Sequence, residues 1–105
     1  MSGHRVRHVV LVKFKPETTD AQRVEFIRRS GWSRTHSFVT NYTSGAKVVP
    51  NPYAASNTDE WDWAMTLDFD EDDVLTYRDH PEHRLVGPTV GAYAERYAIL
   101  DFVID

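Results

Sequence analysis

The chain has 105 residues, with 12 Lys and Arg against 16 Asp and Glu, and no cysteine. This length fits one domain over residues 1–105, and the lack of cysteine excludes disulfides, thiolate catalysis and cysteine-based metal sites. No apolar run approaches ~18 residues and the N-terminus has no apolar signal segment, so we expect a cytoplasmic protein without a membrane partner.

The formal net charge of −4 hides an asymmetry between the two halves of the chain. Residues 1–50 carry nine basic and three acidic side chains, a balance of +6, whereas residues 51–105 carry three and thirteen, a balance of −10. The basic residues are scattered and not clustered with aromatic residues, so we expect no nucleic-acid partner. The halves should instead pack together and partly neutralise each other.

The first predicted element is a strand over Val6–Phe14, rich in β-branched residues and followed by Pro16. Alternation places the following residues on one face: Val6, His8, Val10, Val12 and Phe14. Both faces are apolar at the centre, which predicts a strand covered on both sides. On the residues alone, a lone histidine such as His8 on an apolar face is more often a hydrogen-bonded core residue than a functional group.

A helix should follow, with capping candidates at Thr18–Asp20 and a stop at Gly31. Its apolar positions at helical spacing, expected to face the core, are Ala21, Val24 and Ile27. Residues 32–38 form a connector without a clear period, and His36 within it is expected at the surface.

Val39–Val49 predicts a second strand from its aromatic and β-branched content, with a bulge at Ser44-Gly45. The polar segment at residues 50–59 contains two prolines and predicts a loop. Loops of this length are sometimes lids over a site, although a plain connection is the more common outcome.

Trp61–Phe69 is the clearest strand of the sequence. The side chains expected on its buried face are Trp61, Trp63, Met65, Leu67 and Phe69. The acidic run Asp70–Asp73 then predicts a cap and a negative first helical turn, which the helix dipole stabilises. Four consecutive carboxylates on a helix do not converge on one ion, so this run does not predict a metal site.

A short helix is expected next, with Val74, Leu75 and Tyr77 toward the core, ending near Asp79 or His80. Pro81 suits the first turn of a new helix. That helix should be interrupted by two glycines and a proline, at Gly87-Pro88 and Gly91.

The last strand is predicted over Tyr97–Ile104. The element order β-α-β-β-α-β is that of an α+β, ferredoxin-like fold with a four-stranded antiparallel sheet and helices on one face. The other sheet face is left uncovered by its own chain. We therefore expect a homodimer through this open sheet face.

The stretch Tyr77–His83 places a phenol and two imidazoles within seven residues. His83 lies three residues into the predicted helix, where nearby N–H groups disfavour imidazolium and keep a neutral base, and Tyr77 supplies a hydroxyl donor. The residues alone also allow structural roles: a core tyrosine, a capping His80 and an exposed His83. Pro81 separates the two histidines, so we expect no metal here.

Three stretches together resemble a known family: His8–Lys15, Trp63–Phe69 and Tyr77–His83. They carry the patterns H-hydrophobic-F-K and Y-x-x-H-P-x-H of the stress-responsive dimeric α/β-barrel (Dabb) proteins. The resemblance spans nearly the whole chain and implies two sheets paired into a barrel, with a pocket between sheet and helices in each monomer.

The resemblance also implies an activity, because its best-understood enzymes are olivetolic acid cyclase-like. These catalyse intramolecular aldol-type cyclisation of a polyketide in secondary metabolism, without a cofactor. In that pattern His83 is the catalytic base and Tyr77 its catalytic partner, while His8 lines the pocket. We expect a small hydrophobic or polyketide-like substrate, bound by His8, His80 and Trp63.

Other activities fit the same family. Hydroxynitrile lyases of this fold are known, and the alternative to an enzyme is a non-catalytic stress-responsive dimer or small-molecule-binding protein. A redox monooxygenase of similar fold is a weaker third, because nothing in the sequence suggests a flavin or haem site. Residues 32–38 lack the I-P-G/A turn common in the family, and the loop at 50–59 is particular to this chain, so the substrate does not carry over.

Overall fold

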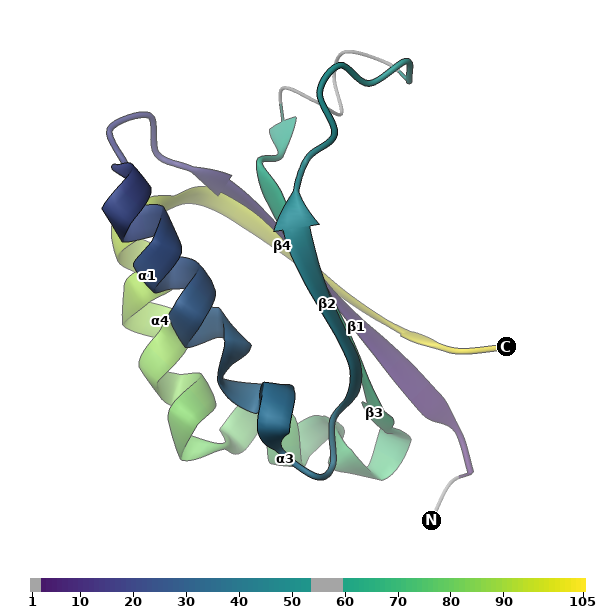
Figure 1. Ribbon diagram of the computed structural model, residues 1–105. Coiled ribbons are helices and arrows are strands. Elements are labelled where there is room, and N and C mark those ends of the chain that lie inside the picture. Colours follow the sequence, from purple (N-terminus) through teal and green to yellow (C-terminus); the bar gives the residue numbers. More distant parts are fainter. Residues whose placement is uncertain (1–2, 54–59) are drawn as a thin grey trace.

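The computed structural model describes residues 3–53 and 60–105 and shows a four-stranded antiparallel sheet with helices on one face (Figure 1). The strands are β1 (Arg5–Phe14), β2 (Thr40–Ala46), β3 (Trp63–Asp70) and β4 (Ala94–Val103), in the spatial order β2-β3-β1-β4. The helices are α1 (Asp20–Ser30), α3 (Val74–Asp79) and α4 (Pro81–Tyr93), with 3₁₀ turns η1 (Gly31–Thr35) and η2 (Glu71–Asp73). The predicted ferredoxin-like α+β fold is confirmed. The predicted loop at 50–59 lies mostly outside the described residues.

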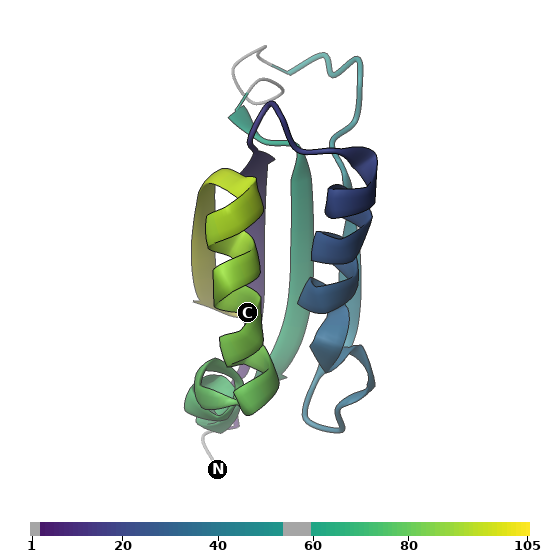
Figure 2. The same cartoon turned by 90° about the vertical axis from the view of Figure 1, so that its left-hand side faces the viewer.

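β1 lies at the centre of the sheet and pairs with β3 on one side and β4 on the other. Its helix-facing side chains are those expected from alternation, and Val6, His8, Val12 and Phe14 are all buried. On β3, Trp63, Met65, Leu67 and Phe69 are buried on the same face. The core therefore lies between these two strands and the helix layer, where α1 and α4 lie side by side (Figure 2).

α1 begins and ends where predicted, but it turns a different side toward the sheet. Thr19 caps it in a reciprocal capping box with Gln22, and Gly31 ends it. Phe26 is buried with its ring edge-on to Phe14 at 5.2 Å and to Trp63 at 5.7 Å. The expectation that Ala21 and Val24 face the core is wrong, since both are exposed. The aromatic ring removes more apolar surface from water than the smaller residues and sets the rotation of the helix.

β2 is shorter than the predicted second strand and its irregularity lies elsewhere. The register shifts between Thr40 and Thr43, not at Ser44-Gly45. Asn41 has a φ of 53°, in the left-handed region that asparagine enters more readily than most residues.

The chain between β3 and β4 contains the predicted break at Pro81. The Asp70 side chain accepts a hydrogen bond from the Asp72 amide at 2.9 Å and opens η2, as expected of the acidic run. Leu75 is exposed and not part of the core, contrary to expectation. The expected interruption of α4 at Gly87-Pro88 is also wrong, because the helix continues to Tyr93. Packing against α1 offsets the weak helix propensity of this segment.

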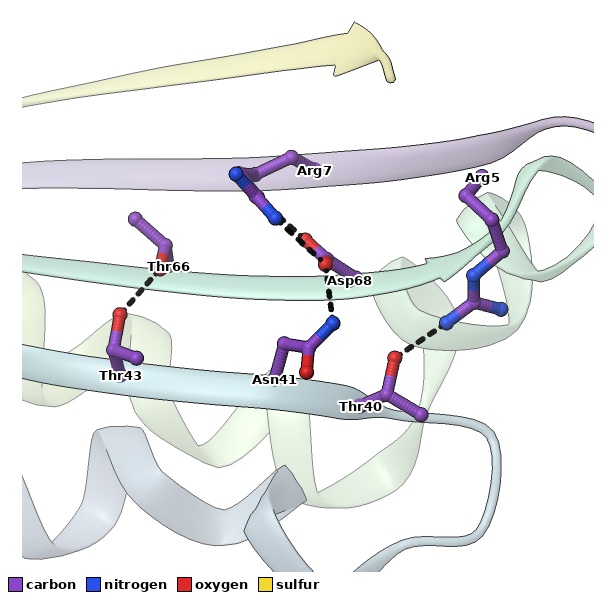
Figure 3. A network of polar contacts seen from close by, with 7 residues as sticks. All are labelled: Arg5, Arg7, Thr40, Asn41, Thr43, Thr66 and Asp68. Carbon is purple, nitrogen blue, oxygen red and sulfur yellow. Dashed lines mark hydrogen bonds and ion pairs between the residues drawn. The ribbon is translucent and has the colours of Figure 1, made fainter. Parts of the chain in front are cut away.

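The other sheet face is uncovered in the monomer and divides into two parts. Figure 3 shows the polar part, where the Arg7 guanidinium donates to both Asp68 oxygens at 2.8 and 3.0 Å and Asn41 donates to the same carboxylate at 2.9 Å. These bonds from Arg7 lower the pKa of the buried Asp68. The apolar part lies on β4, where Leu100 and Phe102 are exposed.

Ion pairs join the basic first half of the chain to the acidic second half, as the charge asymmetry predicts. Arg7–Asp68 on the sheet, Lys13–Glu95 and Lys47–Asp62 are of this kind. Among the described helices, none combines the length and the apolar character that crossing a membrane requires.

Candidate functional site

A cavity of about 280 Å³ lies between the helix-facing side of the sheet and helices α1 and α4. Most of its wall is apolar and comes from β1, β3 and α4, including Val10, Val12, Trp63, Met65 and Val86. The polar side chains in its lining are His8, Ser30, Tyr77, His83, Arg84 and Tyr97. Three of the predicted site residues from distant parts of the sequence, His8, Tyr77 and His83, therefore meet in one mostly apolar space, together with Trp63.

His83 is held by a backbone carbonyl of α3. Its Nδ1 lies 2.9 Å from the carbonyl oxygen of Arg78, so Nδ1 carries a proton and donates it to that bond. In the neutral ring the lone pair is then on Nε2. Burial is the main cause that lowers the pKa of His83, nearby His8 acts in the same direction, and the bond to Arg78 opposes both. The side chain is therefore suited to accept a proton at neutral pH.

Tyr77 lies between the two histidines of the cavity. Its ring centroid is 4.9 Å from that of His8 and 4.9 Å from that of His83, and the indole of Trp32 stacks on it at 5.2 Å. Burial raises the pKa of the phenol well above its ordinary value, an effect that the nearby Ser33 hydroxyl partly offsets. The hydroxyl therefore stays protonated and can act as a hydrogen-bond donor.

His8 pairs with Asp101, a residue that the sequence analysis did not place in the site. The two residues are opposite each other in the β1–β4 register, and the Nδ1 of His8 lies 2.5 Å from an Asp101 carboxylate oxygen. The carboxylate fixes the proton on Nδ1 and leaves Nε2 of the neutral ring as an acceptor. The signal in the sequence was a single carboxylate on the same strand face as Tyr97 and Ile99.

His80 lies outside the cavity lining and caps α4. Its Nδ1 accepts a hydrogen bond from the Glu82 amide at 3.1 Å. The ring stacks on Trp32 with centroids 4.6 Å apart and packs edge-on with the ring of His36, with centroids 4.8 Å apart. His36 is half-buried in this aromatic cluster and not at the surface as expected, because the η1 turn brings it back against Trp32.

A possible metal-ligand set lies at this cap. Over residues 3–53 and 60–105, one set of three ligating side chains has its donor atoms within 4.8 Å of one another: His36, His80 and Glu82. The His80 Nδ1 lone pair is occupied by the Glu82 amide, so the proton of the neutral ring is on Nε2. A metal-bound imidazole normally donates its second ring nitrogen's proton outward. The hydrogen bonds of the cap therefore do not suit a metal ligand.

The arrangement supplies the groups needed for proton transfer at a carbon or an oxygen. His83 offers an unprotonated nitrogen, Tyr77 a neutral donor and His8 a second oriented imidazole, all beside a mostly apolar wall. An apolar wall strengthens each of these polar interactions relative to water.

Comparison with known proteins agrees with this fold. The sequence model described as Stress responsive A/B Barrel Domain matches residues 6–104. No curated protein matches the chain. Similar solved structures include a dimeric ferredoxin-like protein of unknown function from Thermobifida fusca, with 24% identity, a TM-score of 0.79, and coverage of 99% of this chain and 94% of that one.

Two further structures are nearly as similar in shape. A Dabb family protein with a ferredoxin-like fold from Mesorhizobium loti has 18% identity and a TM-score of 0.77, over 97% of this chain and 98% of that one. The hydroxynitrile lyase of Passiflora edulis has 16% identity and a TM-score of 0.77, over 96% and 94%. The likeness to these solved structures shows only a shared fold. The match to the family model shows more, because it covers residues 6–104 of the sequence. The protein therefore belongs to the stress responsive A/B barrel domain family.

Proposed function

We propose that the protein is a cofactor-independent acid–base enzyme that forms or breaks carbon–carbon bonds next to a carbonyl group. The observation that carries this proposal is the hydrogen bond from Nδ1 of His83 to the Arg78 carbonyl. This bond leaves the Nε2 lone pair of the neutral ring available, and the ring packs against the Tyr77 phenol. We place it among polyketide cyclase-like enzymes, with a small, mostly apolar carbonyl compound as substrate.

The proposed reaction is an intramolecular aldol addition that closes a ring. Nε2 of His83 takes a proton from a methylene between two carbonyls, and the resulting enolate carbon bonds to the carbon of a third, more distant carbonyl of the same substrate. Tyr77 donates a hydrogen bond to the oxygen that becomes negative, and the imidazolium returns the proton to that oxygen. General-base catalysis of this kind typically contributes about 10²–10⁴-fold, and the cavity adds orientation.

The same two groups suit a carbon–carbon lyase. In cyanohydrin cleavage, the base removes the hydroxyl proton, the carbonyl forms and cyanide leaves with the bonding electrons. The imidazolium then gives its proton to cyanide, so that hydrogen cyanide is released and the base is restored. The choice between these reactions rests on the substrate that the cavity admits. Either reaction uses His83 as the base, and neither reaction as written includes a redox step or a metal ion.

The proposal includes a homodimer. The uncovered sheet face exposes Leu100 and Phe102 on β4, and the related proteins from Thermobifida fusca and Jannaschia are described as dimeric. A second copy would remove this apolar surface from water. The alternative, a non-catalytic dimer that binds a small molecule or serves a stress response, uses the same interface and lacks turnover.

The test compares products from linear poly-β-ketone thioesters generated in situ by a promiscuous synthase, in the presence of buffer, wild type, His83→Ala or His36→Ala. The proposal expects a cyclised product with wild type and His36→Ala, and its loss with His83→Ala. His36 is the matched control because it is a half-buried imidazole outside the cavity. Equal turnover by His83→Ala and wild type would show that the base is assigned wrongly. A parallel incubation with mandelonitrile separates cyclase from lyase activity.

A further inference from the structure

A second hollow of about 370 Å³ lies next to the cavity, between α4 and β4. We call it the α4–β4 groove. Its lining consists of Gly87, Val90 and Gly91 on α4, the uncharged Ala94 and Tyr97 of β4, and the charged Glu95 and Arg96 between them. The cavity and the groove share Gly87, Val90 and Tyr97, so the two hollows adjoin each other. One end of this space lies beside His83, and the other opens at the start of β4.

The helix layer leaves the inner side of β4 open along the groove. Tyr97 pairs with Val12 in the β1–β4 register and therefore shares its sheet face. Yet Val12 is 1% exposed, whereas Tyr97 and its neighbour on that face, Ile99, are 56% and 53% exposed. Figure 2 shows why: α4 runs in front of the sheet on the side of β4 and leaves that outer strand partly uncovered.

The α4 side of the groove carries two glycines one turn apart. Glycine inside a helix is about fivefold less favourable than alanine. A Cβ at Gly87 or Gly91 would meet no atom within 4 Å, and neither glycine has a positive φ. Neither close packing nor backbone conformation therefore requires a glycine here, and what the missing side chains provide is open space in the groove.

We propose that Gly87 and Gly91 keep the α4–β4 groove open for the unbranched apolar tail of an elongated substrate. The head of this substrate, which bears the carbonyl groups, lies in the cavity beside His83 and Tyr77, and this placement of the head rests on the proposed function. Val90 and Tyr97 supply apolar contacts to the tail where the cavity meets the groove.

The experiment is calorimetric titration of the full chain with three 2,4-diones of increasing chain length: pentane-2,4-dione, octane-2,4-dione and undecane-2,4-dione. Each methylene that enters the groove should tighten binding by about fourfold or less. In Gly87→Val and Gly91→Val the gain with chain length should disappear. In Gly91→Val, whose residue lines the groove and not the cavity, the affinity for pentane-2,4-dione should also stay within about twofold. Ala92→Val is the matched control, because residue 92 is an exposed α4 position that lines neither hollow.

Folding is checked with Gly87→Ala and Gly91→Ala, which should raise Tm by a few degrees, since no neighbouring atom opposes the added methyl. A chain-length gain that survives in both valine variants, or that Ala92→Val also removes, overturns the proposal. So does an absence of dione binding by wild type. Titration of His83→Ala with the same diones, together with the turnover assay on wild type, separates the two hypotheses. If the gain with chain length persists in His83→Ala but wild type shows no turnover, the groove proposal stands and the acid–base enzyme is rejected.

Discussion

The imidazole of His83 donates from Nδ1 to the carbonyl oxygen of Arg78 across 2.9 Å, and this bond links the first turn of α4 to the last turn of α3. The break at His80-Pro81 makes the bond possible, because it turns the chain so that a side chain of one helix meets a free carbonyl at the end of the other. The position of the proposed base is thus a consequence of where the proline interrupts the helix. The same bond orients the other ring nitrogen.

The lowered pKa of His83 predicts a pH dependence of stability that needs no substrate. Burial disfavours the imidazolium in the folded state, so between the folded pKa and the ordinary value the unfolded chain binds more protons. Stability should therefore fall as pH decreases through this window and be unaffected above it. Urea midpoints measured at about pH 8 and about pH 5 should differ more in wild type than in His83→Gln, whose side chain does not titrate. If the urea midpoint changed by the same amount between the two pH values in both proteins, the burial of His83 would not be the cause of the pH dependence.

Tyr77→Phe separates the hydroxyl of Tyr77 from its ring. The ring packs against His8, His83 and Trp32, and phenylalanine keeps these contacts, so Tm should change by no more than a few degrees. If the hydroxyl stabilises the oxyanion of the proposed reaction, kcat should fall by about 10²-fold or more. Steady-state kinetics on the cyclised product give this value, and Tyr93→Phe, outside the cavity lining, is the control. Unchanged kcat in Tyr77→Phe would leave Tyr77 a packing residue alone.

Asp101 is predicted to set the tautomer of His8. The Asp101 side chain is 38% exposed, so replacing it removes little buried surface, while the Nδ1 of His8 loses its acceptor. In two-dimensional ¹H–¹⁵N spectra, His8 of wild type should be in the Nδ1-protonated form. In Asp101→Leu it should instead show a mixture of the Nδ1-protonated and Nε2-protonated tautomers, as in an unconstrained imidazole. Asp105→Leu is a control near the same end of the chain. A spectrum identical to wild type would mean that another group fixes the ring.

The sequence predicted the elements well where short-range chemistry decides them. Thr19 and Gly31 bound α1, the alternation in β1 and β3 sets the buried faces, and Pro81 begins a helix. Each of these rests on a few neighbouring residues, so one sequence is enough. The motif Tyr77–His83 also contains two of the three polar side chains that meet in the cavity, Tyr77 and His83; the third is His8.

Tertiary packing decided what the sequence did not predict. The burial of Phe26 in place of Val24 and the continuity of α4 through Pro88 both depend on how α1 and α4 lie on the sheet. Asp101 lies in the site because the β1–β4 register pairs it with His8, a residue 93 positions away in the sequence. Strand alternation gave its face, but the pairing partner could not be read from β4 alone.

The apolar part of the uncovered sheet face is predicted to form the dimer interface. Leu100 is 63% exposed on β4, and its strand neighbour on the same face is Phe102. Leu100→Glu places a charge where a second copy would exclude water, which is costly because the carboxylate has no partner there. Sedimentation velocity should show a dimer for wild type and a monomer for Leu100→Glu. Leu85→Glu, an equally exposed leucine on α4, should remain dimeric. If both variants dissociate or neither does, the interface lies on another surface of the protein.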